Sequence, residues 1–399
     1  MHGDKKVILH LTFDGVLFDQ VYVRFEGMEK YENRYLIDQL GRNQEFRCIK
    51  NTEKLLVADT LEEWGEIVSD PDVDIIYLHG LWQSYLNAVD FIRPNVVVMW
   101  WCYGMEIYEN VNRWPPLLPL KIYKPRTHRF LLHNSSLFHA LNIELSYSFP
   151  KLYILLITTY TFLKGTHGNK LIQLLSRIDF ASTPLSTELV EIKRKHTFIK
   201  AKPFVLRGKI EKKPLETHRE PGCIILEHSA NITNNHLDIV FFLKKKRLNL
   251  NGRDVYLPLS YGEKKLAERV KKEAKFAGAN VHCLMDILPF NEYSEMMNNC
   301  THAIYGMIRQ SGLGNINLCF QKGIKVFFFK DSILYKHFKS EGYYVYSIED
   351  DLDDNSIREP LLPNQALCNY EKFYSRFINV GSYQQQLDNI LKNIEYDEH

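Results

Sequence analysis

The stretch RQSGLGNINLCFQKGIKVFFF, residues 309–329, places a loop, a helix and a strand in direct succession. It begins as a polar loop interrupted by glycines and continues as about a dozen residues of helical pattern. After Gly323 it ends in a run of β-branched and aromatic residues, which predicts a buried strand. A buried strand directly behind such a helix is typical of a parallel α/β sheet.

The loop of this stretch has the composition of a phosphate-binding site. Gly312 and Gly314 allow the backbone to approach a ligand closely, and the following helix offers unpaired N–H groups and about half a positive charge at its first turn. Arg309 adds a cation whose planar fork matches phosphate oxygens, while Gln310 and Asn315 are neutral donors. We interpret the loop as a phosphate cradle. A second interpretation is that the glycines serve close packing alone.

The same alternation of strands and helices extends outward from this stretch. In the second half, strands are predicted at 223–229, 254–262, 280–288 and 301–307, with helices at 236–245, 263–277 and 289–299. In the first half, strands are predicted at 7–13, 74–80 and 95–104, with helical patterns at 21–40 and 86–92. Short apolar runs without strict alternation belong to strands covered on both faces. We therefore predict an α/β protein with two Rossmann-like domains facing each other across a cleft.

The division between the domains is expected where the composition changes. Residues 193–221 are rich in Lys, Arg and Pro and poor in periodic apolar positions. We predict an N-terminal domain at 1–205, a linker at 206–221 and a C-terminal domain at 222–399. Packing of the final helix back on the N-terminal domain is left open, and so is the alternative that 193–221 is only a surface loop.

The composition is that of a globular protein in a reducing compartment. It is 45% hydrophobic and 25% charged with a formal net charge of +2, so no general polyanion-binding role follows and no nucleic-acid partner is expected. The seven cysteines form no CxxC pair, and the first residues lack a signal-peptide cleavage pattern, which predicts a cytoplasmic location. The longest uncharged apolar run, 152–163, has 12 residues, whereas a membrane-spanning helix needs roughly 20.

Two more polar loops follow predicted strands of the second half. The loop EHSANITNNH contains Ser229 and Asn234, and the loop PLSYGE contains Ser260 and Tyr261. Because the carboxyl ends of parallel strands meet at one edge of a sheet, these loops and residues 309–315 indicate a nucleotide-sized polar ligand. The alternative is that their polar side chains only cap the helices that follow.

These motifs resemble one family of glycosyltransferases. The C-terminal half is similar, through SANITNNH, LPLSYG, FNEYSEMMNNC and RQSGLGNINLCFQKGIKV, to the TDP-N-acetylfucosamine:lipid II N-acetylfucosaminyltransferases, glycosyltransferase family 56 of the GT-B type. The N-terminal half carries the similarity through LHLTFD (9–14), YLHG (77–80) and WWCYGMEIYE (100–109). The resemblance implies a nucleotide-sugar donor, with TDP as nucleotide, held mainly by the C-terminal domain. It also implies a polyprenyl-linked glycan acceptor in bacterial surface polysaccharide synthesis. The domain at 1–205 would then be the acceptor-binding domain, and the domain at 222–399 the nucleotide-sugar-binding domain.

The sequence departs from the pattern of retaining GT-B enzymes, which often carry two glutamates eight residues apart around this loop. Gln310 and Leu318 occupy those positions here. This departure does not decide between retention and inversion, and of the two we favour an inverting transferase. Such an enzyme needs a general base beside the acceptor hydroxyl and stabilisation of the departing diphosphate.

Candidates for the base lie in the N-terminal half, at the carboxyl ends of predicted strands: Asp14, His79 and Glu106, with Glu106 and Asp14 preferred. The alternatives are a helix cap for Asp14, a buried structural imidazole for His79 and a first-turn helix charge for Glu106. No DxD pair stands at a strand end, so a metal-independent reaction without a cofactor is expected.

Residues 113–172 mix aromatic and basic side chains ahead of the apolar run. Trp114, Tyr123 and Phe130 alternate with cations, which predicts contact with an anionic membrane surface at the cytoplasmic face of the inner membrane. The cations are Lys121, Lys124, Arg126 and Arg129. An internal helix pair is the alternative. Two other functions also stay open: a GT-B-like epimerase or phosphorylase with soluble substrates, and a non-catalytic nucleotide-sugar-binding protein.

Overall fold

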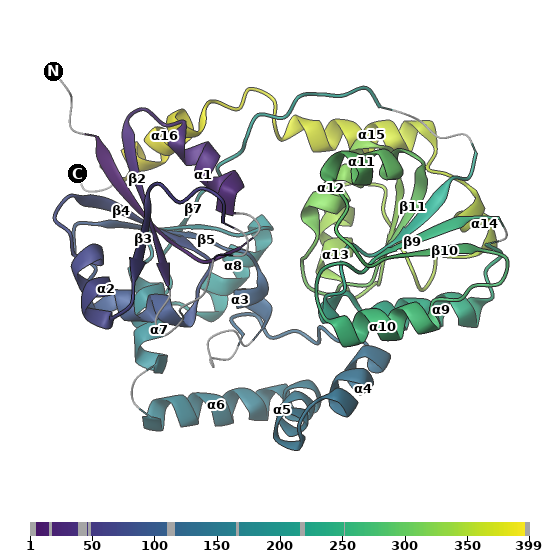
Figure 1. The fold of residues 1–399 in the computed structure, drawn as a ribbon, viewed down its shortest axis with the longest axis horizontal. Coiled ribbons are helices and arrows are strands. Elements are labelled where there is room, and N and C mark those ends of the chain that lie inside the picture. The colour runs from purple at the N-terminus through teal and green to yellow at the C-terminus, as the bar shows by residue number, and fades with distance from the viewer. Residues whose placement is uncertain are drawn as a thin grey trace. The chain divides into compact units, whose positions relative to one another are not determined.

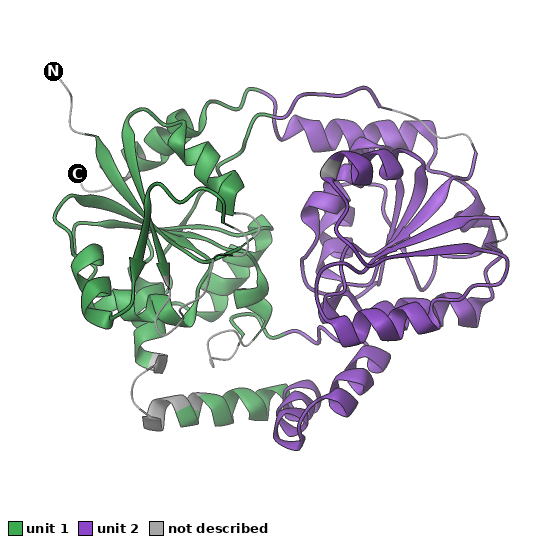
Figure 2. Cartoon of the chain, in the orientation of Figure 1, with its two compact units in different colours: residues 1–119, 150–209, 379–399 green, residues 120–149, 210–378 purple. Residues whose placement is uncertain are grey.

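A computed structural model of the chain describes residues 5–15, 18–38, 46, 49–109, 116–164, 167–215, 220–250 and 252–395. The chain forms two compact units (Figure 2). The first unit comprises residues 1–119, 150–209 and 379–399, and the second comprises 120–149 and 210–378. The chain therefore crosses between the units after residues 119, 149, 209 and 378.

The first unit is built on a seven-stranded sheet in the order β3-β2-β1-β4-β5-β6-β7, and all of its strand pairs are parallel (Figure 1). Six of the seven residues of β1 are buried, as expected for a strand with helices on both faces. The strand order reverses between β1 and β4. The strands are β1 (Lys6–Thr12), β2 (Tyr31–Asp38), β3 (Leu55–Ala58), β4 (Val73–His79), β5 (Val97–Trp101), β6 (Phe180–Ser182) and β7 (Lys202–Pro203).

The last helix of the chain completes the core of the first unit. Leu387 of α16 is fully buried in the same apolar cluster as Phe25 and Tyr77. The hydroxyl of Tyr31 also donates to Oδ1 of Asp388 at 2.5 Å. The helices of this unit are α1 (Phe18–Glu26), α2 (Leu61–Val68), the 3₁₀ helix η1 (Gln83–Asp90), α3 (Met105–Tyr108), α6 (Pro150–Lys164), α7 (His167–Arg177), α8 (Ser186–Lys195) and α16 (Tyr383–Glu395).

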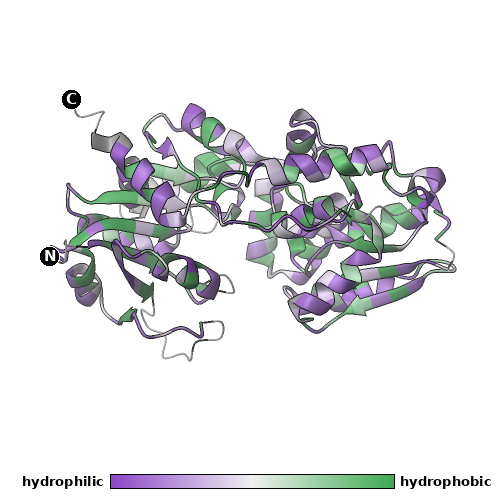
Figure 3. Cartoon of the chain, turned by 90° about the horizontal axis from the view of Figure 1, so that it is seen from above, coloured by the Kyte–Doolittle hydropathy of each residue, from purple (hydrophilic) through white to green (hydrophobic). Residues whose placement is uncertain are grey.

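The second unit repeats this design with a six-stranded parallel sheet in the order β10-β9-β8-β11-β12-β13. The order reverses between β8 and β11, so the α/β class and two Rossmann-like domains are confirmed. Many strand segments of both units are green in Figure 3, where green marks hydrophobic residues. The strands are β8 (Cys223–Leu226), β9 (Asp254–Pro258), β10 (Asn280–Leu284), β11 (Cys300–Tyr305), β12 (Lys325–Phe328) and β13 (Tyr346–Ser347).

The second unit also contains helices, of which α4 packs against α9 and α5 against α4, and a 3₁₀ turn ahead of α9. They are α4 (Pro125–Asn134), α5 (Leu137–Ser148), η2 (Ile232–Asn234), α9 (His236–Lys246), α10 (Lys264–Glu273), α11 (Phe290–Asn298), α12 (Leu313–Gln321), α13 (Ile333–Ser340), α14 (Asp354–Arg358) and α15 (Pro363–Ser375). Among the described residues, no helix is long and apolar enough to cross a membrane.

Residues 120–149, which the predicted division assigns to the N-terminal domain, pack with the second unit. The side chain of Asn235 donates to the carbonyls of Ile122 (3.0 Å) and Gly306 (2.9 Å) and accepts from the backbone N–H of Lys124. The carboxylate of Asp238 accepts from the first N–H groups of α4. Hydrogen bonds between residues more than 100 positions apart thus set this boundary, and no local composition change marks it.

One element of the first half was predicted wrongly. The helical pattern assigned to 21–40 is divided into α1, which ends at Glu26, and strand β2, which begins at Tyr31. Tyr31, Asn33 and Tyr35 are buried and alternate with the more exposed Glu32 and Arg34, so this segment follows the period of a strand.

Candidate functional site

Three loops meet at the carboxyl edge of the second sheet, after β8, β9 and β11. The β8 and β9 loops are joined by backbone hydrogen bonds, from Ala230 N to Tyr261 O at 2.6 Å and from Glu263 N to Ala230 O at 3.0 Å. Gly262 makes this approach possible: its φ is +123°, and a Cβ there would lie 2.5 Å from the Ala230 carbonyl oxygen. Ser260 and Tyr261 are thereby brought beside the β8 loop, with the Tyr261 side chain exposed.

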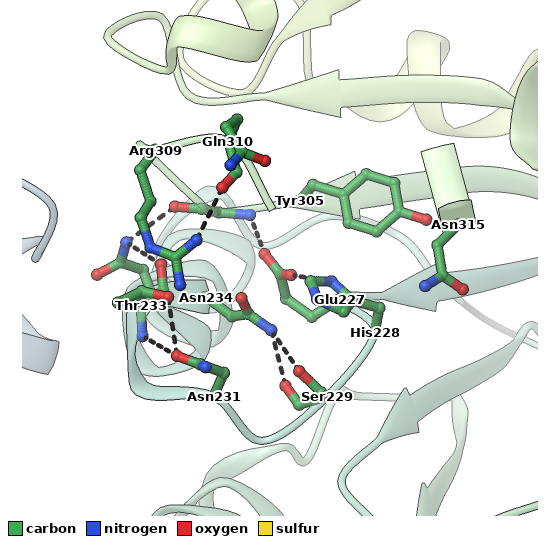
Figure 4. Close-up of polar contacts among 12 residues, drawn as sticks. Glu227, His228, Ser229, Asn231, Thr233, Asn234, Tyr305, Arg309, Gln310 and Asn315 are labelled. Atoms are coloured by element: carbon green, nitrogen blue, oxygen red, sulfur yellow. Dashed lines mark hydrogen bonds and ion pairs between the residues drawn. The ribbon is translucent and has the colours of Figure 1, made fainter. Parts of the chain in front are cut away.

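The β8 loop is held by its own side chains (Figure 4). Asn234 is fully buried and donates from Nδ2 to the carbonyl (2.8 Å) and the hydroxyl (3.1 Å) of Ser229. Asn231 caps η2 by accepting from the N–H and hydroxyl of Thr233. Polar side chains of this loop therefore do cap the following helical turn, as the alternative to ligand binding predicted. These contacts also leave buried Oδ1 of Asn234 without a hydrogen-bond partner among the described residues, which is a common feature of sites that bind polar ligands.

The β11 loop has a buried and an open part. Arg309 and Gln310 are only 4% and 3% exposed, and Nη1 of Arg309 donates to the Gln310 carbonyl at 2.7 Å. The first turn of α12 is open by contrast, because a Cβ on Gly314 would meet no described atom within 4 Å. Asn315 accepts from the Tyr293 hydroxyl at 2.8 Å. The cradle therefore offers an accessible helix N-terminus, while its arginine is engaged with its own loop.

The motif-based prediction missed a buried acid and its histidine neighbour at the end of β8. Glu227 is fully buried in a left-handed conformation with φ of 62°, and Oε1 accepts from the backbone N–H of Gly306. Oε2 of Glu227 lies 3.4 Å from Nδ1 of His228. The His228 ring in turn lies close to Gly312, because a Cβ added to Gly312 would be 2.7 Å from the ring. Positive φ in a buried non-glycine residue is uncommon and concentrates at functional sites.

The electrostatics of this edge favour neutral groups inside it. Burial raises the pKa of Glu227, against the lowering effects of His228 and of the N–H groups of Gly306 and Met307. Burial, with repulsion from His228, lowers the pKa of His236 to about 3, and neither ring nitrogen of His236 has a hydrogen-bond partner among the described residues. The local signal was available in the sequence, since an acid and a histidine directly follow the apolar run CIIL.

The three candidates for the base lie at the carboxyl edge of the first sheet. Asp14 follows β1, and its Oδ1 accepts from the backbone N–H of Ile49 at 3.1 Å. His79 ends β4, is 2% exposed, and has its Nε2 3.0 Å from Nδ1 of His10. Burial lowers the pKa of both imidazoles, that of His10 to about 3. This placement matches the structural-imidazole alternative for His79.

Glu106 lies in α3, directly after β5, and is 8% exposed. Its Oε1 accepts from the N–H of Tyr103 at 2.9 Å. Burial raises its pKa, against the opposing effect of hydrogen bonds from its own backbone and from Tyr103. A carboxyl group with a raised pKa has the property that a general base requires. The three candidates belong to the first unit and the donor-binding candidates to the second.

An aromatic cluster that the sequence analysis did not identify lies at the same edge of the first sheet. The ring centroids of Phe13 and Trp82 are 4.7 Å apart, and those of Phe13 and Tyr103 are 5.8 Å apart. All three side chains are half-buried, and Gly80, with φ of +82°, is close enough to Trp82 and Tyr103 that a Cβ would crowd both. The cluster adjoins Asp14 in sequence and follows the strand that ends at His79.

Comparison with solved structures agrees with this architecture at low sequence identity. The N-terminal domain of Candida albicans trehalose-6-phosphate phosphatase matches with a TM-score of 0.57 and 8% identity over 98% of this chain and 96% of its own. The apo structure of OtsA matches with a TM-score of 0.53 and 8% sequence identity, over 98% of this chain and 99% of its own. An O-GlcNAc transferase from Thermobaculum terrenum matches with a TM-score of 0.52 and 10% sequence identity, over 98% of this chain and 68% of its own.

Comparison with protein families confirms the predicted family. The family described as 4-alpha-L-fucosyltransferase, glycosyl transferase group 56, matches residues 196–395, which is half of the chain and includes the whole β8–β11 edge. The chain therefore belongs to glycosyltransferase group 56 and is a glycosyltransferase with the two Rossmann-like domains of the GT-B class.

Proposed function

We propose that this glycosyltransferase moves an amino-deoxy sugar such as N-acetylfucosamine from a nucleoside-diphosphate donor, with TDP as the nucleotide, to a polyprenyl-diphosphate-linked oligosaccharide. The reaction would serve bacterial surface polysaccharide synthesis at the cytoplasmic face of the inner membrane. The observation that carries the proposal is the β8–β11 edge, where the strand order reverses and polar loops surround an open helix N-terminus. Ligands of open α/β sheets bind at such reversal points.

In this proposal the diphosphate of the donor binds against the first turn of α12. Gly314 leaves room for phosphate oxygens, and the N–H groups of the turn and its partial positive charge favour an anion. His228 lies at the same turn and is held by Glu227, so it is a further candidate donor to the phosphates. Arg309 shapes the loop by donating from Nη1 to the Gln310 carbonyl, and its guanidinium carries further N–H donors of the kind that bind phosphate oxygens.

The transfer step needs one proton acceptor and one site of charge stabilisation. The acceptor hydroxyl loses its proton to Glu106 or Asp14, and its oxygen forms a bond to the anomeric carbon as the bond from that carbon to the diphosphate oxygen breaks. The negative charge that develops on the leaving diphosphate is offset by the α12 N-terminus and His228. Phe13, Trp82 and Tyr103 offer apolar ring faces on which an acceptor sugar could stack.

The membrane part of the proposal rests on fewer cations than the sequence indicated. Nζ of Lys124 lies 2.9 Å from Asp331 and 3.7 Å from Glu349, and its side chain is 19% exposed. Nζ of Lys121 is 5.1 Å from the ring centroid of Tyr147. Lys124 is thus engaged within the second unit, and Trp114 lies outside the described residues.

A ligand screen followed by a transfer assay tests the proposed function. Thermal unfolding should be shifted upward by TDP and TDP-sugars more than by other nucleotides, since a ligand at 100 times its dissociation constant adds roughly 2.7 kcal/mol. Transfer from a stabilising TDP-sugar to a polyprenyl-linked acceptor in detergent should then release TDP and form a glycoside. Release of an epimerised sugar nucleotide, phosphate-dependent release of a sugar phosphate, or binding without turnover would each overturn the proposal.

A further inference from the structure

The second unit contains a cationic groove between α4 and α10, beside the first turn of α9. Its volume is about 780 Å³. Six cations line it, Arg126, Arg129, Lys264, Lys265, Arg269 and Lys272, against the carboxylates of Glu268 and Glu273, so its net formal charge is +4. The whole chain has a formal net charge of only +2, which means that positive charge is concentrated here.

Most of this charge is not neutralised within the protein. Arg269 pairs with Glu273 at 2.5 Å, whereas Lys264, Lys265 and Lys272 are exposed. Lys264 and Lys265 stand in the first turn of α10, which itself contains no acidic residue and follows the N-cap Glu263. Cations at a helix N-terminus oppose the helix dipole, so helix stability does not explain them. A bound anion would relieve that repulsion.

An exposed apolar helix adjoins the groove. None of the described residues of α5 is buried, and Leu137, Phe138 and Leu141 are 79%, 79% and 61% exposed. The far end of α5 is held to α4, because the rings of His128 and Tyr147 stack with centroids 3.9 Å apart. The first two turns of α5 therefore follow the end of α4, where His133 and Asn134 line the groove.

We propose that the groove and the first two turns of α5 together bind the surface of an anionic phospholipid bilayer. The groove takes the phosphates of lipid headgroups, and Leu137, Phe138 and Leu141 enter the boundary between headgroups and acyl chains. This inference rests on the proposed function, because a polyprenyl-linked acceptor resides in a membrane. Exposed apolar side chains next to a cationic groove favour a bilayer over a soluble polyanion, which would leave them in water.

The inference assigns membrane binding to the donor-binding unit. Asn235 and Asp238, at the start of α9, hold the chain that leads into α4 and the first turn of that helix. They directly follow the loop that contains Ser229 and Asn234. The proposed membrane surface and the proposed donor site are therefore built on adjacent segments of one sheet edge.

Cosedimentation of the full-length protein with vesicles tests the groove. Lys264, Lys265 and Lys272 are replaced together by Gln, and the matched control replaces Lys244, Lys245 and Lys336, which are exposed cations of the same unit outside the groove. Phosphatidylcholine vesicles with phosphatidylglycerol should bind the wild type and the control. Binding of the groove variant should fall by on the order of a hundredfold, since each cation near an anionic surface contributes about fivefold.

The apolar part is tested by replacing Leu137, Phe138 and Leu141 with Ser. The control replaces Leu362, which directly precedes α15 and is 57% exposed, and Leu367, which lies in α15 and is 50% exposed. The α5 variant should bind vesicles more weakly than the wild type, and it should keep the wild-type thermal unfolding temperature because these side chains are already in solvent. Its residual binding should depend more strongly on salt, since only the charge contribution remains.

Transfer to an acceptor in neutral detergent separates this inference from the proposed function. Both variants should transfer sugar in detergent like the wild type and lose activity on an acceptor embedded in anionic vesicles. Failure of every protein to transfer in detergent would overturn the proposed function but not vesicle binding. Vesicle binding by the groove variant equal to that of its control, wild-type binding to pure phosphatidylcholine, or retention on DNA without vesicle binding would overturn the membrane surface.

Discussion

Oε2 of Glu227 lies 3.4 Å from Nδ1 of His228, at the point where β8 ends and the chain takes a left-handed conformation. The carboxylate is anchored from the other side by the backbone N–H of Gly306, which follows β11. The pair thus joins the two strands between which the sheet order reverses. The imidazole of His228 lies against Gly312, the N-cap residue of α12.

Replacement of His228 by Ala should weaken TDP binding by about 1.5–3 kcal/mol, because a hydrogen bond to a charged phosphate is lost. Replacement by Gln, which keeps a donor, should recover part of the affinity. Calorimetric titration measures both. His282→Ala is the matched control, since His282 pairs with Asp254 at 2.8 Å outside this edge. Equal affinities for His228→Ala and this control would show that His228 does not contact the donor.

Replacing two glycines of the cradle by alanine should affect stability differently but lower TDP affinity in both cases. Gly312→Ala should lower both stability and TDP affinity, because its φ of +61° disfavours a side chain and the new Cβ would displace His228. Gly314→Ala should keep or raise stability, by up to about 1 kcal/mol, since its surroundings are open and alanine favours helix. Its TDP affinity should nevertheless fall. Wild-type affinity in Gly314→Ala would mean that phosphate does not approach this turn.

Glu106→Gln should lower turnover by about 10²–10⁴-fold and stabilise the fold at neutral pH. Burial raises the pKa of Glu106, so the folded state favours the protonated form, and its stability falls as pH rises through the folded pKa. Glutamine avoids that loss. The gain in unfolding temperature should therefore be present at pH 7 and disappear toward acid pH. An unchanged turnover would move the role of base to Asp14, for which Asp14→Asn is the corresponding test.

Arg309→Ala should reduce TDP affinity by about 1.5–3 kcal/mol, whereas Gln310→Ala and Asn315→Ala should have smaller effects because these side chains are neutral. The variant Arg309→Lys shows whether the loss comes from a missing phosphate contact or from a changed loop shape. Lysine keeps a charge for phosphate but cannot reproduce the planar donor to the Gln310 carbonyl, so a loss as large as that of alanine would assign Arg309 to loop shape.

Turnover should survive EDTA. In the proposed reaction the charge of the leaving diphosphate is offset by the α12 N-terminus and by His228, so no divalent cation is needed. The assay is sugar transfer before and after chelation, followed by readdition of Mg²⁺ or Mn²⁺. Activity that disappears with EDTA and returns with either ion would contradict this assignment.

The sequence predicted well that three polar loops lie at one edge of the second sheet, because the signals for them are local. Glycines and polar residues that directly follow short apolar runs identify the loops after β8, β9 and β11, and parallel pairing then brings them together. The Glu227–Gly306 contact was not predictable in this way, since it joins residues 79 positions apart and leaves no periodic signal. The same holds for Asn235, whose bonds to Ile122 and Lys124 place residues 120–149 with the second sheet.

The sequence also could not predict which partners surround each candidate side chain. His79 and Glu106 look alike as polar residues near strand ends, but the structure buries the imidazole against His10 and leaves the carboxyl group in a short helix beside Tyr103. The engagement of Lys124 with Asp331 and Glu349 was equally hidden, because ion pairs between distant residues depend on the tertiary fold.

The position of α16 has a consequence for biosynthesis. Strands β1 to β7 emerge from the ribosome first, yet their core includes Leu387, and Tyr31 has its partner in Asp388. The nascent first unit therefore exposes an apolar surface until α16 has been synthesised, whereas every residue of the second unit has been synthesised by residue 378. A sequence fused after residue 399 would follow directly on the helix that completes the core of the first unit. A premature stop codon between residue 378 and α16 would leave the β8–β11 edge complete but would remove α16 from the first unit.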